Sequence, residues 1–408
     1  MSKKRNPMRK SCDENGRFVV KSNIMSAPRI KTLTRARKEE ISPVKAHLKA
    51  QLPALTSTGV RRYRLPYHES ILLELNEAGF FEAKDYLKRL YEHDNELEIP
   101  KIKKLKEQRH LIEKIQYGLV NAELAKRRNE KIEQAMQMLK IALFFQSLMP
   151  EWFWIADEFF KSALKISSEI VEDGGEILNI IKYIYGNFLF HGMRDPMSAF
   201  TLLDEARKGS QGKPWDAYKI LKNQPRYLFR DINLVLNEVL IALAQQSRKT
   251  HRKFAVEIVT RAIERAIDSG SQEHLARSLY EAGVTYMSAG NIDEALDKFL
   301  EYLARVERIS DPNGLCEAHK QLAAVYQVLE DSARVKWHLI LFKQHAEQSG
   351  LVARLAEAHY YLGKFELEEG RPSSATPHLT FAFESYKNLE MINEMDKARF
   401  LAGMSKGL

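Results

Sequence analysis

A spacing of forty residues recurs in the second half of this chain. Each stretch at this spacing has a small residue, an aromatic residue three positions later, glycine seven later, alanine twelve later and a large apolar residue sixteen later, with a few departures. The corresponding residues are Gly283, Tyr286, Gly290, Ala295 and Phe299, then Ala323, Tyr326, Glu330, Val335 and Leu339, then Gly363, Glu366, Gly370, Ala375 and Leu379. A pattern that recurs at fixed length predicts structural units that pack on their neighbours.

The order of small and large residues predicts two antiparallel helices in each unit. Small residues allow two helices to approach closely, and glycine favours the end of a helix. This is the logic of the tetratricopeptide repeat, whose usual length of about 34 residues is exceeded here. We therefore predict an all-α, right-handed superhelical tetratricopeptide solenoid with a period of about 40 residues.

The positive charge of the chain is concentrated at its start. Residues 1–64 contain 17 of the 63 Lys and Arg but only 4 of the 54 Asp and Glu. This segment therefore carries a charge of +13, whereas the remainder, with 46 basic and 50 acidic residues, carries −4. Because a folded nucleic-acid binder needs a concentrated basic face, nucleic acid is an unfavoured partner for the repeats. No apolar run approaches the length of a membrane span, and no membrane partner is expected.

Composition and periodicity predict five segments. Residues 1–64 are rich in Lys, Arg, Ser and Pro and are expected to form a disordered basic tail. Residues 65–130 are predicted to form a helical hairpin followed by a charged helix that begins near Ile102. Residues 131–235 are predicted to form degenerate repeats, in which Gly186 occupies the small-residue position. The clear repeats span 236–390, and a capping helix is expected for 391–408.

The chain shows no pattern that indicates catalysis or a cofactor. Its twelve histidines are dispersed without metal-ligand spacing, and its two cysteines, Cys12 and Cys316, are far apart. The segment Gly209–Pro214 lacks the spacing of a phosphate-binding loop. We therefore expect no catalytic residue, no metal site and no cofactor, and a protein that is not an enzyme.

Two further segments have a structural and a functional interpretation. The aromatic cluster of Trp152, Phe153, Trp154, Phe159 and Phe160 is expected to be core between stacked hairpins, and the alternative is an exposed anchor for a partner helix. The basic residues of 101–131 alternate with Glu, which favours a solvated helix face with ion pairs over a basic patch.

The first helix of each tetratricopeptide repeat lines the concave groove. With the small residue as position eight, positions two, five, nine and twelve face this groove. The predicted partner-binding residues are Arg277, Tyr280, Met287, Glu317, Lys320, Gln327, Glu357, Tyr360 and Lys364. Exposed Tyr and Arg are frequent in binding hot spots, and the alternative is that these are ordinary surface residues. Tyr280 and Tyr360 occupy equivalent positions, and neither is expected to be needed for stability.

Four stretches resemble the tetratricopeptide repeat protein 29 family of motile cilia and sperm flagella. They are residues 67–87, 154–176, 278–311 and 353–375, and the second leads into the junction Asp173-Gly174-Gly175. The tail 1–64 and the segment 207–235 depart from the family. The resemblance implies a scaffold of the axoneme, located in the cytoplasm and cytoskeleton, that acts with dynein-arm or intraflagellar-transport proteins in flagellar beating.

A second function class rests on the basic tail. Tubulin tails and nucleic acids are both polyanions, so the charge of +13 does not separate them. Lys3-Lys4-Arg5 with Arg9-Lys10 also suits a nuclear import signal. The alternative to the axonemal scaffold is therefore a cytoplasmic or nuclear adaptor whose tail binds microtubules or nucleic acid.

Overall fold

The computed structural model describes residues 57–97, 104–221 and 227–407, together with isolated positions between 42 and 50. The chain divides into two units, Met1–Pro66 and Tyr67–Leu408. In the first unit the described segment is helix α2 (Ser57–Arg64), whose last turn carries Arg61, Arg62 and Arg64. Residues 57–64 of the tail that was predicted to be disordered are therefore helical, and the rest of that tail lies mostly outside the described residues.

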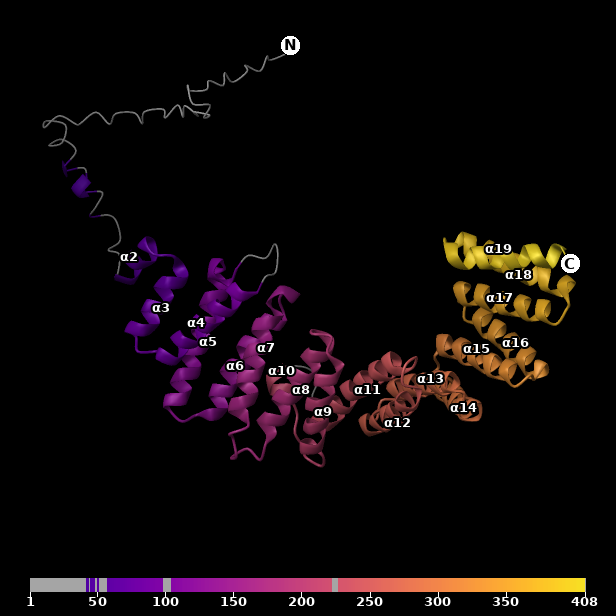
Figure 1. Cartoon of the computed structure of the whole chain (residues 1–408), viewed down its shortest axis with the longest axis horizontal. Coiled ribbons are helices and arrows are strands. Elements are labelled where there is room, and N and C mark those ends of the chain that lie inside the picture. The colour runs from indigo at the N-terminus through magenta and orange to yellow at the C-terminus, as the bar shows by residue number, and fades with distance from the viewer. Residues whose placement is uncertain are drawn as a thin grey trace, which may run out of the picture. The chain divides into compact units, whose positions relative to one another are not determined.

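The described part of the second unit consists of helices joined by turns; consecutive helices pack side by side, except at the short α10, where α9 packs on α11 (Figure 1). The helices are α3 (Tyr67–Glu77), α4 (Phe81–Glu96), η1 (Leu105–Glu107), α5 (Arg109–Arg127), α6 (Lys131–Gln146), η2 (Pro150–Trp152), α7 (Phe153–Ser167), α8 (Glu176–His191), α9 (Pro196–Ser210) and α10 (Tyr218–Leu221). They continue with α11 (Leu228–Ser247), α12 (Arg252–Ser269), α13 (Gln272–Ala289), α14 (Ile292–Ile309), α15 (Pro312–Val328), α16 (Ser332–Gln348), α17 (Val352–Glu368), α18 (Pro372–Asn388) and α19 (Ile392–Gly407). This order confirms the predicted all-α solenoid of tetratricopeptide-like hairpins.

Turns with left-handed backbone geometry follow at twenty-residue intervals after α12. Their φ angles are 73° at Gly270, 89° at Gly290, 55° at Ser310, 56° at Glu330, 65° at Gly350, 72° at Gly370 and 56° at Glu390. A residue in this conformation ends a helix, and glycine adopts it without steric cost. Because the turns are evenly spaced, the helices between them have nearly equal lengths, which makes the period visible in the sequence.

Each of two regular hairpins has a glycine on its first helix against a large side chain on its second. A Cβ atom built on Gly283 of α13 would lie 2.6 Å from the Phe299 ring of α14, and one on Gly363 of α17 would lie 2.6 Å from Cγ of Leu379 of α18. Ala295 is fully buried in the same cluster as Phe299. The predicted contact between small and large residues is therefore confirmed.

The irregular part of the chain contains the same contact at other spacings. In α8 a Cβ on Gly186 would lie 2.6 Å from Leu203 of α9, and in α5 a Cβ on Gly118 would overlap the Ile141 side chain of α6. The small-residue position assigned to Gly186 is thus confirmed. Gly118 was not predicted, because it lies in a segment that reads as strongly charged.

The expected single charged helix from Ile102 to Arg127 is wrong. A short 3₁₀ turn, η1, precedes α5, and the Asp94 carboxylate accepts a hydrogen bond of 2.8 Å from the Leu105 backbone N–H. The solvated face with ion pairs is confirmed among the described residues. The pairs include Arg109–Glu113 at 2.9 Å, Lys126–Glu82 at 2.7 Å and Lys131–Glu169 at 3.1 Å.

The aromatic cluster of α7 forms core. Phe159 and Phe160 are fully buried, and the Phe160 ring stacks on Tyr185 of α8 with centroids 5.2 Å apart. The Tyr185 hydroxyl donates to the Asp157 carboxylate at 2.7 Å. The interpretation as packing between hairpins is therefore confirmed.

Candidate partner-binding groove

The first helices of the regular repeats lie next to one another along one face. α15 contacts α17 and α17 contacts α19, while the second helices α16 and α18 pack beside them. α13 is the first helix of the preceding repeat, and it packs on the second helix of that repeat, α14. The nine predicted binding residues all lie on α13, α15 and α17.

Three of the predicted residues belong to one network of ion pairs between α15 and α17. The Lys320 ammonium lies 2.7 Å from Glu317 and 3.0 Å from Glu357. Arg354, which was not predicted, lies 3.1 Å from Glu317 and 2.7 Å from Glu357. Burial alone would raise the pKa of Glu317, but hydrogen bonds from Lys320 and Gln321 outweigh it and the net pKa is lowered. The four charges therefore pair within the chain and join adjacent repeats.

Tyr280 is a packing residue, which contradicts the expectation that it is not needed for stability. Its ring lies 5.5 Å from Tyr302 and 6.3 Å from Phe299, centroid to centroid. Its hydroxyl donates to Glu317 at 3.2 Å, and burial raises its pKa to about 12. The repeat spacing assigns Tyr280 to the groove, but its side chain packs against α14 and bonds to α15.

Tyr360 and Glu357 line a cavity of about 370 Å³ between α17, the end of α18 and α19. Its other lining residues are Ala353, Arg354, Tyr361, Tyr386, Met391, Glu394 and Lys397. Burial raises the pKa of the Tyr386 and Tyr361 hydroxyls, which therefore remain protonated donors. Aromatic surface beside hydroxyl, guanidinium and carboxylate groups suits a polypeptide segment, which offers apolar side chains and backbone amides together.

Gln327 and Lys364 meet at one acidic residue. The Gln327 side-chain amide donates to Glu368 at 2.9 Å, and the Lys364 ammonium lies 3.6 Å from the same carboxylate. Arg277 and Met287 do not contact Gln327, Lys364 or Glu368. Arg277 is exposed on α13, and Met287 packs against the cluster around Phe299.

The period itself indicates the residues that the prediction missed. Lys397 follows Glu357 by forty residues, as Glu357 follows Glu317 and Glu317 follows Arg277. Phe400 follows Tyr360 in the same way. α19 therefore continues the row of first helices. The capping helix predicted for 391–408 corresponds to α19, but its forty-residue relation to α17 was not part of that prediction.

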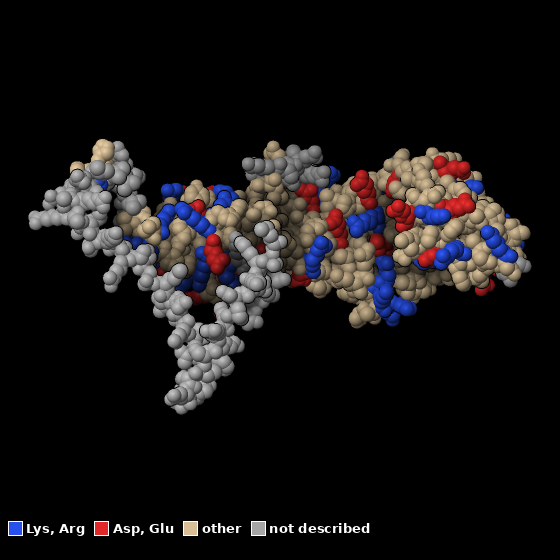
Figure 2. Space-filling view, turned by 90° about the horizontal axis from the view of Figure 1, so that it is seen from above, with Lys and Arg blue, Asp and Glu red and all other residues tan. Residues whose placement is uncertain are grey.

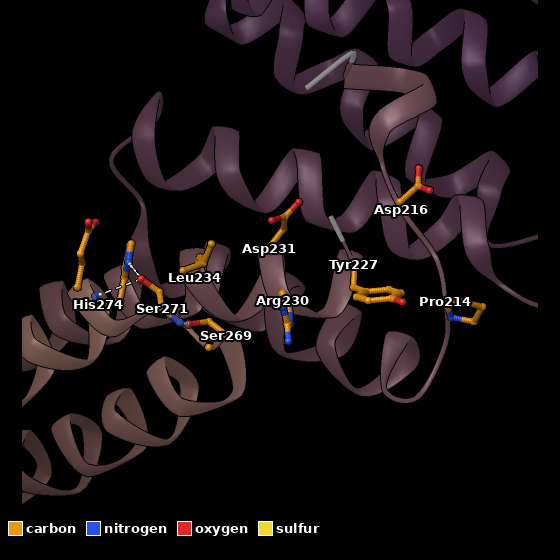
Figure 3. A pocket seen from close by; sticks show the side chains of 11 residues that line it. Pro214, Asp216, Tyr227, Arg230, Asp231, Leu234, Ser269, Ser271 and His274 are labelled. Carbon is orange, nitrogen blue, oxygen red and sulfur yellow. Dashed lines mark hydrogen bonds between the residues drawn. The ribbon is translucent and has the colours of Figure 1, made fainter. Parts of the chain in front are cut away.

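A second hollow, of about 680 Å³, lies between the turn before α11 and the turn before α13 (Figure 3). Among its polar residues, Ser271 and His274 form hydrogen bonds within the turn before α13. Ser271 caps α13 by accepting from the His274 backbone N–H, and their side chains lie 2.8 Å apart. Figure 3 shows the Asp231 carboxylate and the Arg230 guanidinium pointing in different directions. These charges do not converge on a common point, as a charged ligand would require.

Two histidine pairs recur forty residues apart. The Nδ1 atoms of His319 and His338 are 3.1 Å apart, and those of His359 and His378 are 3.0 Å apart. Burial lowers the pKa of His319 to about 3 and of His338 and His359 to about 4, so each pair is neutral at pH 7. Within the described ranges, no three His, Cys, Asp or Glu side chains are arranged to hold a metal ion.

Figure 2 shows basic and acidic side chains interspersed on the face of the described residues that it displays. This distribution agrees with the internal ion pairs of the repeats. No helix in the described part of the chain is long and apolar enough to cross a membrane.

No protein-family model matches the chain, and no curated protein matches it. Among solved structures, the apo form of RapI is 14% identical, with a TM-score of 0.46 over 73% of this chain and 76% of RapI. BtubC from P. vanneervenii is 15% identical, with a TM-score of 0.38 over 64% of this chain and 92% of BtubC. A putative kinesin light chain of Podosopora anserina with TPR-like repeats is 14% identical, with a TM-score of 0.36 over 52% of this chain and 95% of that chain. At these identities and scores, the similarities do not identify a family or a function for the chain.

Proposed function

We propose that this chain is a non-enzymatic scaffold that binds a segment of a partner protein in the groove of α15, α17 and α19. The observation that carries the proposal is the cavity of about 370 Å³ lined by Tyr360, Tyr361 and Tyr386. It lies on the row of first helices and combines aromatic rings with the charged groups of Arg354 and Lys397. A protein segment supplies the matching apolar, amide and charged groups.

The groove presents few charges for recognition, because Glu317, Lys320, Arg354 and Glu357 already pair with one another. Breaking this half-buried network to bind a single charged group would leave its partners unpaired. The partner segment therefore contacts the partly exposed Tyr360 and Tyr361 and the exposed Lys397, rather than replacing an ion pair. This favours a segment with aromatic or aliphatic side chains and polar groups that match Lys397 and Glu394, the two charged residues that line the cavity outside the network.

The partner that we propose is a component of the motile axoneme, of the dynein arms or of intraflagellar transport. The support is the resemblance of residues 67–87, 154–176, 278–311 and 353–375 to an axonemal tetratricopeptide family. On this proposal the chain resides at the cilium or flagellum and supports its beating.

The test is affinity purification from ciliated-cell extract with wild type, Tyr360→Ala and Lys397→Glu. Lys397 is exposed, so reversing its charge leaves the fold intact. Lys387→Glu is the matched control, because Lys387 is an exposed lysine of α18 that does not line the cavity. Both cavity variants should lose the main captured proteins, and the control should retain them.

Two outcomes would contradict the proposal in different ways. Identical captured proteins for wild type and both cavity variants would exclude the groove as the binding site. A groove-dependent set without axonemal proteins would exclude the axonemal partner and leave the scaffold function intact.

A further inference from the structure

The cavity between α17 and α19 opens where the ion pairs of the preceding junction are not repeated. Between α15 and α17, the cations Lys320 and Arg354 each pair with a glutamate of the other helix. One repeat later, Tyr360 and Glu394 occupy the places of these two cations. Tyrosine carries no charge and glutamate carries the opposite one, so the same pairs do not form. The side chains leave a cavity of about 370 Å³, the tyrosine cavity, between α17 and α19.

The tyrosine cavity suits an aromatic side chain with polar neighbours. Its volume exceeds the roughly 150 Å³ of a protein cavity that holds benzene. Tyr386 is buried at its wall, and aromatic rings pack well against one another. Glu394 and Lys397 also line it, and neither forms an ion pair within the part of the chain that the structure describes. Both charges are therefore available to polar groups of a ligand.

A smaller hollow lies on the other side of α17, between α17 and α15. This small hollow has a volume of about 120 Å³. Its buried walls are apolar and include Val335 and Leu339 of α16 and Phe365 of α17. The volume is below the roughly 150 Å³ that holds benzene, so the small hollow accepts an aliphatic side chain but not an aromatic ring.

The polar groups at the rim of the small hollow contact one another. Gln327 donates to Glu368 at 2.9 Å, and Lys364 lies 3.6 Å from the same carboxylate. A charged side chain that entered the small hollow would lose its water and meet an apolar wall, which is costly. The small hollow therefore selects an uncharged aliphatic group.

The two hollows are close enough for one short segment to reach both. Tyr361 lines both of them, and α17 lies between α15 and α19 (Figure 1). Residues 353–361 of α17 border the tyrosine cavity and 361–368 border the small hollow, so the middles of these ranges are about 11 Å apart along the helix. Packed helices lie about 9 Å apart, which makes the total separation about 14 Å. An extended chain covers this distance in about four residues.

We infer that the partner segment crosses α17 in an extended conformation, with an aromatic side chain in the tyrosine cavity and an aliphatic side chain in the small hollow, about four residues apart. The inference rests on the proposed function, because it specifies the sequence that the groove of α15, α17 and α19 selects. Polar groups beside the aromatic residue contact Glu394 and Lys397. The ion pairs between α15 and α17 stay intact.

The probe is a phage library of random dodecapeptides, selected on the full-length protein. Wild type should enrich peptides in which an aromatic and an aliphatic residue are separated by about three to five positions. Ala324→Leu fills the small hollow, which Ala324 lines as a partly exposed residue. Ala333→Leu is the matched control, because Ala333 is exposed on α16 and lines neither hollow. Circular dichroism and the melting temperature verify that both variants are folded.

Titration of one selected peptide measures the aliphatic contact. Replacing its aliphatic residue with alanine should weaken binding to wild type about tenfold, because an apolar side chain is no longer buried. Ala324→Leu should weaken the original peptide by a similar factor, and it should not distinguish the original peptide from its alanine variant. Such non-additivity shows that the two residues are in contact. Ala333→Leu should behave as wild type.

The outcomes separate this inference from the proposed function. Peptides that bind Ala324→Leu as tightly as wild type, or that share no aliphatic residue about four positions from the aromatic one, would overturn the inference and leave binding in the groove intact. Peptides that bind Tyr360→Ala and Lys397→Glu as tightly as wild type would exclude the groove and with it the proposed function. A wild type that enriches no peptide would contradict both.

Discussion

The irregular region α5–α9 and the regular region α13–α18 use the same contact to join two helices. Gly118 meets Ile141 and Gly186 meets Leu203 in the first region, and Gly283 meets Phe299 in the second. The glycine and its partner are sixteen residues apart in α13–α14 but seventeen apart in α8–α9. The contact is therefore independent of the period. Only the equal helix lengths of the second region make it periodic in the sequence.

The two regions differ in what surrounds this contact. One continuous hydrophobic core extends from Ile71 to Ala282 and includes Phe145, Phe159 and Phe160. From Ala266 onward, except for Ala282, the buried residues form small separate clusters. Histidine pairs join the two helices of a hairpin there in addition. A solenoid in which each repeat packs only on its neighbours tolerates such separate clusters.

The largest expected effect comes from filling the glycine positions in both regions. Gly186→Leu and Gly283→Leu should each lower the free energy of unfolding by about 1–3 kcal/mol, because the new side chain overlaps Leu203 or Phe299. Urea or thermal unfolding measures both. Gly403→Leu is the control, since a Cβ atom built on Gly403 would meet no atom within 4 Å, and it should cost nothing.

A large loss for Gly283→Leu together with none for Gly186→Leu would contradict the equivalence of the two regions. Equal losses for all three variants would show that leucine itself, rather than the contact, is responsible.

Replacing Tyr280 should have a smaller effect than filling a glycine position. Tyr280→Ala removes a half-buried ring from between Phe299 and Tyr302, and it should cost about 1–2 kcal/mol. Tyr360→Ala should cost less, because that ring packs against buried residues on one side but borders the cavity on the other, and Tyr280 in addition loses its hydrogen bond to Glu317. Chemical unfolding of the two variants compares them directly. A larger loss of stability for Tyr360→Ala than for Tyr280→Ala would contradict the assignment of Tyr280 as the more important packing residue of the two.

The smallest expected effect is on the pH dependence of the regular region. The lowered pKa values of His319, His338 and His359 mean that the unfolded chain binds protons more readily than the folded one below the ordinary histidine pKa of 6.5. Stability is therefore complete above that pH and is lost progressively as the pH falls toward about 4.

His359→Leu should reduce this acid loss by roughly 1 kcal/mol for the first pH unit below 6.5. Leu279 occupies the equivalent position of the first repeat, so leucine is compatible with the hairpin. Thermal unfolding of wild type and variant between about pH 7 and about pH 5 measures the difference. Parallel curves for the two proteins would show that His359 does not titrate on unfolding.

The sequence was sufficient to predict the fold class, the hairpins of α13–α18 and the burial of Phe159 and Phe160, because each depends on local spacing or strong hydrophobicity. It did not reveal the contact of Gly118, since the partner Ile141 lies at a spacing that no repeat defines. It also did not reveal that Tyr280 packs against Phe299 and Tyr302, because a position in a repeat predicts a helix face but not a rotamer. Whether the groove residues bind a partner stays a prediction.

The most direct test of the scaffold proposal is amide hydrogen exchange of the chain alone and in complex with a protein recovered from the affinity experiment. Exchange reports which helices a partner covers. If the groove binds the partner, α17 and α19 should become protected in the complex, while the second helix α16 should exchange as before. Protection confined to α16 and α18, with α17 and α19 unchanged, would contradict binding in the groove.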